Sequence, residues 1–183
     1  FGNTADGVNL DTNLPSFVGN SEVTLADLNG DGRKDVLSSS VDSDSAALGV
    51  NENLGGGEFD SQRLLYESSE RSVGQILVAD LDGDGDNDVL APLPNSVTGE
   101  GPISWFENVD ADSTFKDPKP IAETGSPTTP VRFPLIRLLD LNNDGNRDVV
   151  ARVGGPSEFK LIWFESEGGG SFKNREVLLQ GLT

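Results

Sequence analysis

The sequence predicts an all-β protein built from β-propeller blades, each blade a sheet of four antiparallel strands. Similar segments recur about every 50–60 residues along the 183-residue chain. Apolar residues alternate with other residues in these segments, which is the period of a half-buried strand. The 22 Gly and 10 Pro weigh against helices. Repeats of this length are typical of propeller blades, whereas the strands of an ordinary β-sandwich, the alternative, do not recur with such internal similarity.

The first two strands of each unit are predicted on either side of an aspartate-rich loop. Three segments align without gaps: VTLADLNGDGRKDVL (23–37), ILVADLDGDGDNDVL (76–90) and IRLLDLNNDGNRDVV (136–150). Alternating apolar residues open each segment and predict the first strand. The short run after the aspartates, which begins Asp-Val in all three, predicts the second strand.

The third strand of each unit is predicted from a second set of similar segments, LGVNENLGGGEF (48–59), ISWFENVDADSTF (103–115) and LIWFESEGGGSF (161–172). Their first halves are rich in β-branched and aromatic residues. Gly-rich turns then lead to a fourth strand, predicted in FDSQRLLYE, FKDPKPIAE and FKNREVLL. Trp105 and Trp163 occupy equivalent positions, so we expect them to pack between blades.

The repeat predicts a single array over residues 1–183. Its units are predicted at 17–66, 67–122 and 123–183, with 1–16 as the outer strand of a preceding blade. The leading segment is inferred because Phe1 has counterparts in the Phe residues that close each third segment. The chain opens within the pattern, so we expect a processed product or a fragment of a longer protein.

The composition narrows the classes of function. The net charge of −18 is unlike that of nucleic-acid-binding proteins, which need clustered Lys and Arg, and suits cations, basic surfaces or solubility. The chain contains neither Cys nor His, which removes disulfides, thiolate and imidazole ligands and the commonest general base. Glu107 and Glu165 recur with the repeat, which is typical of structural residues, so we expect no enzyme. No apolar run reaches the length of about 20 residues that spans a bilayer, so membrane insertion is not expected.

The aspartate loops share the pattern D-x-[DN]-x-D-G-x-x-D, which predicts a metal site in each. Alternating short side chains on a tightly curled loop converge on one point, and the invariant Gly permits the positive φ that the curl needs. The seventh residue is expected to contribute its backbone carbonyl, since its side chain varies. The predicted ligands are Asp27, Asn29, Asp31, Arg33 and Asp35 in the first loop; Asp80, Asp82, Asp84, Asp86 and Asp88 in the second; and Asp140, Asn142, Asp144, Asn146 and Asp148 in the third.

These ligands predict Ca²⁺, about three ions with one in each loop. All the donors are oxygens, which disfavours zinc and copper, and calcium accepts six to eight of them. Asp and Gly also form ordinary turns, but three aligned loops with the same flanks favour a metal. An EF-hand is excluded, because its twelfth residue is acidic whereas Ser38, Ala91 and Ala151 stand there. The second loop has the most carboxylates and is expected to bind calcium most tightly.

The aspartate loop between two strands, together with the WFEN…F segment, resembles the FG-GAP/VCBS repeats and the calcium-bearing propeller blades of integrin α-subunits. The resemblance implies that calcium is structural and that ligands bind on other loops. Propellers of that family have about seven blades. The three counted here imply a part of a larger propeller or an oligomer.

These observations lead to a predicted function as a calcium-stabilised extracellular or cell-surface module for binding, adhesion or surface assembly. One alternative is a structural subunit of an extracellular filament or matrix, and another is a lectin-like propeller. The expected partners are an unidentified protein or glycan ligand and either further blades or other copies of the chain. Neither nucleic acid nor a membrane is an expected partner.

Overall fold

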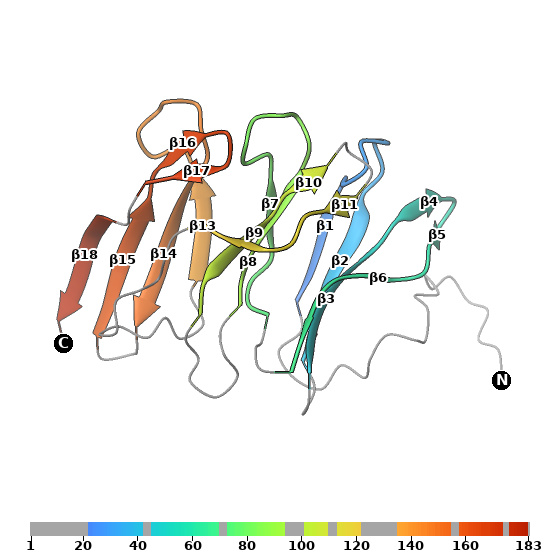
Figure 1. Ribbon diagram of the computed structural model, residues 1–183, viewed down its shortest axis with the longest axis horizontal. Helices are drawn as coiled ribbons and strands as arrows, with labels where there is room; N and C mark the ends of the chain where they lie inside the picture. The colour runs from blue at the N-terminus through green and yellow to red at the C-terminus, as the bar shows by residue number, and fades with distance from the viewer. Residues whose placement is uncertain are drawn as a thin grey trace.

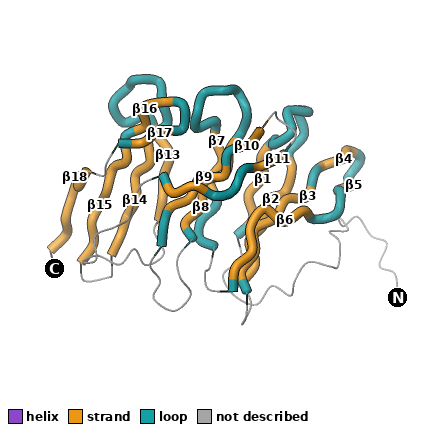
Figure 2. Tube along the Cα trace, in the orientation of Figure 1, coloured by secondary structure: helices purple, strands orange, loops and turns teal. Residues whose placement is uncertain are grey.

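The computed structural model describes residues 22–41, 45–69, 73–93, 101–109, 113–121, 135–154, 158–173 and 176–182. These residues form three four-stranded antiparallel sheets, which stand side by side in a row (Figures 1 and 2). The predicted all-β fold with four-stranded blades is therefore confirmed. The described strands do not close into a ring.

The first sheet has the strand order β1-β2-β3-β6, so strands that follow one another in sequence are neighbours in space. Its strands are β1 (Val23–Ala26), β2 (Asp35–Val41), β3 (Ala46–Asn51) and β6 (Arg63–Ser68). The register places Leu25 opposite Val36 and Val50 opposite Arg63. A β-bulge between Leu48 and Gly49 shifts the pairing of β3 with β6.

The second and third sheets repeat this order. The second contains β7 (Leu77–Ala79), β8 (Asp88–Pro92), β9 (Ile103–Phe106) and β12 (Lys119–Pro120). The third contains β13 (Leu135–Leu139), β14 (Asp148–Gly154), β15 (Glu158–Phe164) and β18 (Glu176–Leu182). Trp105 of β9 lies opposite Leu90 and Lys119, and Trp163 of β15 lies opposite Val150 and Glu176, so the two tryptophans are equivalent in register.

A small hairpin separates the third strand from the fourth in every sheet, which the sequence did not predict. These hairpins are β4 (Asn53–Gly55) with β5 (Glu58–Phe59), β10 (Asn108–Val109) with β11 (Thr114–Phe115), and β16 (Ser166–Gly168) with β17 (Ser171–Phe172). The recurring Phe therefore ends the hairpin and does not begin the fourth strand. In the first sheet the physical reason is the Gly-Gly-Gly turn: Gly55, Gly56 and Gly57 all have positive φ, which folds the chain back on itself locally, and the glycines of the third sheet's hairpin do the same.

Two hydrophobic cores lie between consecutive sheets. The core between the first and second sheets contains Leu37, Leu48, Val50, Val89 and Phe106 among its buried residues. The core between the second and third contains Leu90, Ile103, Trp105, Val149 and Phe164. Alternate residues of β8 and β9 enter the two cores, so the second sheet is covered on both faces.

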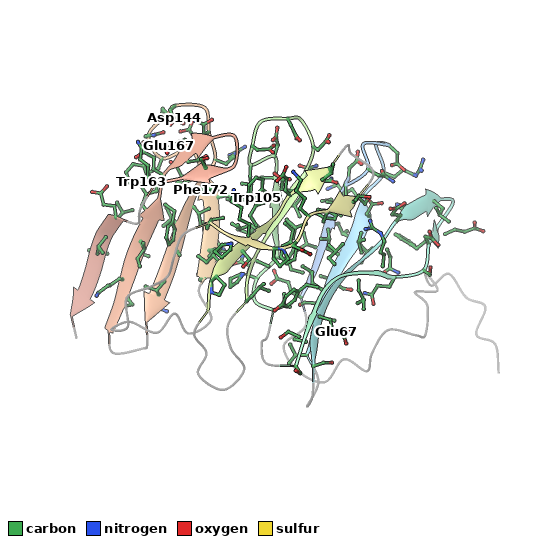
Figure 3. All side chains as sticks on the ribbon, viewed as in Figure 1. Glu67, Trp105, Asp144, Trp163, Glu167 and Phe172 are labelled. Atoms are coloured by element: carbon green, nitrogen blue, oxygen red, sulfur yellow. The ribbon has the colours of Figure 1, made fainter. Side chains whose placement is uncertain are left out.

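Trp105 and Trp163 differ in their surroundings despite their equivalent register. Trp105 is 3% exposed within the second core, which confirms that it packs between sheets. Trp163, labelled in Figure 3, alternates along β15 with Ile162 and Phe164, which belong to the second core. Trp163 therefore lies half-buried on the face turned away from the second sheet, where the described residues place no further sheet. For Trp163, packing between blades remains a prediction.

Several sequence predictions fall outside the described residues. They include the whole leading segment 1–16. The division of the chain into a leading segment and units at 17–66, 67–122 and 123–183 therefore stays a prediction. Within the described ranges, there is no helix with the length and apolar character that crossing a membrane requires.

Candidate metal centre

The three aspartate loops lie at the same edge of the row of sheets, between the first and second strand of each sheet (Figures 1 and 2). We name them the first loop (27–35), the second loop (80–88) and the third loop (140–148). Each connects two paired neighbouring strands, as predicted. The Gly at position six has positive φ in all three: 83° at Gly32, 101° at Gly85 and 95° at Gly145. The predicted curl of the backbone is therefore present in every loop.

The aspartate at position one closes each loop through its own backbone. In the first loop the Asp27 Oδ1 accepts the N–H of Gly30 at 2.8 Å, and its Oδ2 accepts the N–H of Gly32 at 2.9 Å. The same paired contacts recur in the second loop, where Asp80 accepts the N–H groups of Gly83 and Gly85. In the third loop Asp140 accepts the N–H of Asp144, one position later than in the other loops, and that of Gly145. Both oxygens of this carboxylate therefore face the interior of the loop.

The residues at positions three and five form Asx turns that hold the next part of the curl. In the second loop the Asp82 Oδ1 accepts the N–H of Asp84 at 3.2 Å, and the Asp84 Oδ1 accepts the N–H of Asp86 at 2.9 Å. Asn29 and Asp31, and likewise Asn142 and Asp144, repeat these contacts in the other loops. One oxygen of each side chain is thereby fixed toward the loop backbone.

The aspartate at position nine has a structural role that the sequence reasoning missed. Asp88 is fully buried; its Oδ2 accepts the N–H of Leu81 at 3.0 Å, and its Oδ1 accepts the N–H of Asn108 at 2.8 Å. It therefore ties the loop to the small hairpin that follows the third strand. Asp35 and Asp148 are equally buried and make the same two contacts. The recurrence of Asn or Ser at the start of the hairpin was visible in the sequence, but the use of its backbone N–H was not.

The second loop brings three carboxylates together. One carboxylate oxygen from each of Asp80, Asp82 and Asp88 lies within 4.8 Å of the others. No other such group of three Asp or Glu occurs in the part of the chain that the structure describes. Oxygen donors at this spacing suit a hard divalent cation, so these three residues fit the predicted metal. At position three the first and third loops carry Asn, whose amide oxygen is also a ligand but brings no charge.

Neighbouring side chains also contact the position-five aspartate of the first and third loops. In the first loop the Arg33 guanidinium forms an ion pair with Asp31, and its Nε donates to the backbone oxygen of Asn53 at 2.7 Å. Arg33 therefore links the loop to the β4–β5 hairpin and neutralises one predicted ligand. In the third loop the Asn142 Nδ2 donates to the Asp144 Oδ2 at 2.8 Å.

Burial and hydrogen bonds change the acidity of several loop carboxyls. Burial raises the pKa of Asp88 to about 6, although the N–H groups of Asn108 and Leu81 oppose this rise. Burial also raises the pKa of Asp82, with a further rise from the charge of Asp84. In the third loop the N–H of Asn146 lowers the pKa of Asp144. The second loop therefore holds carboxylates that gain from a neighbouring positive charge.

The loops also contact the next sheet in the row. The Asn87 Nδ2 donates to the backbone oxygen of Asp27 at 2.8 Å, and the Asn108 Nδ2 donates to that of Leu28 at 2.7 Å. The Gly169 N–H, in the β16–β17 hairpin, donates to the backbone oxygen of Asp82 at 3.1 Å. Fixing the first or second loop therefore also fixes a contact between sheets.

The comparison with protein families finds a match that covers the first two loops. Residues 27–91 form an FG-GAP-like repeat. The matched FG-GAP-like repeat begins at the first aspartate of the first loop and extends past the end of the second loop, so it contains both. It covers the first sheet from β2 onward and reaches into β8. No curated protein and no solved structure matches the chain.

The remaining predicted ligands are placed by the structure but not tested by it. Asp84 and Asp86 lie in the second loop outside the group of three carboxylates. The untested ligands of the other loops are those predicted in the first loop, Asp27, Asn29, Asp31, Arg33 and Asp35, and those predicted in the third, Asp140, Asn142, Asp144, Asn146 and Asp148. Their assignment as ligands stays a prediction, and so does the use of the position-seven carbonyl.

Proposed function

We propose that the chain is a calcium-stabilised extracellular module for binding or adhesion, in which each aspartate loop holds one structural Ca²⁺. The observation that carries this proposal is the set of side chain-to-backbone contacts repeated in all three loops, together with the Asp80, Asp82 and Asp88 group. FG-GAP-like repeats typically bind calcium, which favours the same ion for the loops within residues 27–91.

Asp80, Asp82 and Asp88 would hold the ion of the second loop. Calcium would supply two positive charges to carboxylates that repel one another and would hold the two ends of the loop together. Because Asp88 also binds the hairpin backbone and Asp82 accepts a hydrogen bond from the third sheet, the ion would stabilise contacts beyond its own loop. We therefore assign calcium a structural role and expect no catalysis.

The extracellular location is part of the proposal. Extracellular modules use calcium sites with dissociation constants as weak as about 10⁻⁴–10⁻³ M, because calcium is abundant outside cells. Loops with three or four carboxylates and exposed ligands suit that range. We expect a protein or glycan ligand, and further blades or another copy against the open sheet faces.

A structural subunit of a filament or matrix is the first alternative. Exposed Val23 and Leu25 on the first sheet, and exposed Leu135 and Leu179 on the third, support it, because they leave apolar surface at both ends of the row. For the lectin-like alternative, Trp105 is buried and has no surface on which a sugar can stack, which leaves the half-buried Trp163 as the candidate of the pair. Electron microscopy of the purified protein and a glycan-binding screen separate these alternatives from the main proposal.

Calorimetric titration with CaCl₂ tests the metal sites directly. We expect about three ions per chain for the natural sequence and about two for Asp84→Ala. The matched control is Asp117→Ala, which removes an exposed aspartate outside the loops and should leave three. EDTA should lower the melting temperature, because an ion that binds only the folded state stabilises it. An absence of bound calcium with unchanged melting in EDTA would overturn the proposal.

A further inference from the structure

The contact between the second and third sheets pairs an aromatic side chain with a glycine turn. The indole of Trp105, on the third strand of the second sheet, packs against Gly170 in the β16–β17 hairpin of the third sheet. A Cβ at Gly170 would overlap the six-membered ring of the indole. Gly170 also has a φ of 69°, a conformation that favours glycine. Both the lack of space and the backbone conformation therefore favour glycine at this position.

The contact between the first and second sheets uses the same two positions with other side chains. Val50 stands where the second sheet has Trp105, and Ser113 stands where the third has Gly170, two residues before the recurring Phe. Both are buried, and the Arg63 guanidinium, on the residue opposite Val50, donates to the backbone oxygen of Ser113. A smaller side chain on one sheet thus accompanies a larger turn residue on the next.

The two ends of the row carry the same two positions, and among the described residues neither contacts its counterpart on another sheet. Trp163 lies on the outer face of the third sheet, where Leu135 and Leu179 are 50% and 52% exposed. Gly57, the counterpart of Gly170 in the first sheet, has a φ of 86°, and a Cβ built on it would meet no atom within 4 Å. Among the described residues, Trp163 therefore has no glycine turn against it, and the glycine turn at Gly57 has no tryptophan against it.

These two features cannot meet within one copy, because the third sheet and the β4–β5 hairpin lie at opposite ends of the row (Figure 1). Trp163 has the same side chain as Trp105 at the equivalent position. Gly57 has the same residue type as Gly170 and a similar positive φ. We propose that the third sheet of one copy packs on the first sheet of a second copy, with the indole of Trp163 against Gly57. This inference rests on the association of copies in the proposed function, and it names the residues that would make the contact.

The contact joins two different surfaces, so it is head-to-tail and adds copies into a ring or a filament. The net charge of −18 makes copies repel, which opposes the contact at low ionic strength. Bound calcium and ordinary salt reduce this repulsion. Association should therefore be measured in CaCl₂ with about 0.15 M NaCl, where surface charges are screened beyond about 8 Å.

Sedimentation velocity over a range of concentrations tests the contact. We expect the natural chain to form whole-number multiples of 19.4 kDa, and Trp163→Ala and Gly57→Ala each to remain at 19.4 kDa. Gly56→Ala is the matched control, because Gly56 has a positive φ in the same turn and equal space around it. It should associate like the natural chain.

Mixing the two deficient variants gives the sharpest result. Trp163→Ala keeps the glycine turn and Gly57→Ala keeps the tryptophan, so an equimolar mixture should form dimers and nothing larger. A natural chain that stays monomeric, variants that associate normally, or a mixture that stays monomeric would each overturn the contact. Calcium stoichiometry measured on the same samples is independent of this result, so failure of the contact and failure of the metal sites are distinguishable.

Discussion

The second loop and the first loop share one backbone and differ in charge. Both curl through the same contacts from position one to the backbone N–H groups, and both end in a buried aspartate with two backbone partners. The second loop gathers three carboxylates, whereas the first carries Asn29 and pairs Asp31 with Arg33. The comparison teaches that the fold of the loop and its affinity for a cation are set by different residues.

The largest expected effect concerns the part that both loops share. Asp35→Ala and Asp88→Ala should each lower the free energy of unfolding by about 3 kcal/mol or more in calcium-free buffer, because each leaves two backbone N–H groups without partners. Urea denaturation in EDTA measures this. The exposed Asp84→Ala is the control and should cost less than about 1 kcal/mol. Markedly unequal losses at Asp35 and Asp88 would contradict the shared geometry.

One substitution in the first loop should give it part of the negative charge, and hence of the calcium affinity, of the second loop. Asn29→Asp adds the carboxylate that the second loop has at Asp82, so we expect about tenfold tighter calcium binding there, since ligand charge tunes affinity. Calorimetric titration of a chain that also carries Asp84→Ala and Asp144→Ala isolates the first loop. The same chain with Asn29 retained is the reference. Equal affinities would show that position three does not set the difference.

Acidification should weaken the second loop. A proton on Asp88 competes with calcium, and burial raises the pKa of this carboxyl to about 6. We expect calcium affinity to fall about tenfold between pH 7 and pH 5, measured by titration in a chain with Asp31→Ala and Asp144→Ala.

The stability of the calcium-free protein should depend on pH in the opposite direction. The folded state keeps the Asp88 proton up to about pH 6, and the unfolded chain releases it near 3.8. Stability without calcium should therefore fall as the pH rises through that window. Affinity that is constant from pH 7 to 5 would contradict a role for Asp88.

The smallest expected effect is that of Arg33. Its ion pair with Asp31 lies at the surface, where such pairs contribute about 0–1 kcal/mol. Arg33→Ala should raise calcium affinity in the first loop two- to threefold by releasing Asp31 and removing a positive charge. Lys34→Ala is a matched control, because it removes a neighbouring charge without an ion pair to Asp31. A larger gain from Lys34→Ala than from Arg33→Ala would assign the effect to general charge.

Most of the fold was predictable because its signals are local or repeated. The alternation at Ile76 and Val78 predicted the strand that forms as β7, although both faces of its sheet pack on a core. The invariant Gly85 predicted the positive φ of the loop. The small hairpins were missed, because a Gly-rich turn such as Gly55–Gly57 fits any connection between antiparallel strands. The ninth residue of each loop was predicted only as a ligand, because its second partner, such as Asn108, is distant in sequence.

The sequence by itself determined the strands, the loops and the oxygen donors that the loops carry. The reason is that the alternation that predicts a strand, and the side chain-to-backbone contacts that curl a loop, involve residues close together along the chain. Only the tertiary structure decided which carboxylates are buried and which loops contact a neighbouring sheet. It also separated Trp105, which is buried against Gly170, from Trp163, which occupies the same register on an outer face and is half-buried. The reason is that burial depends on which surface lies opposite, and equivalent residues of a repeat face different neighbours at the middle and at the end of a row.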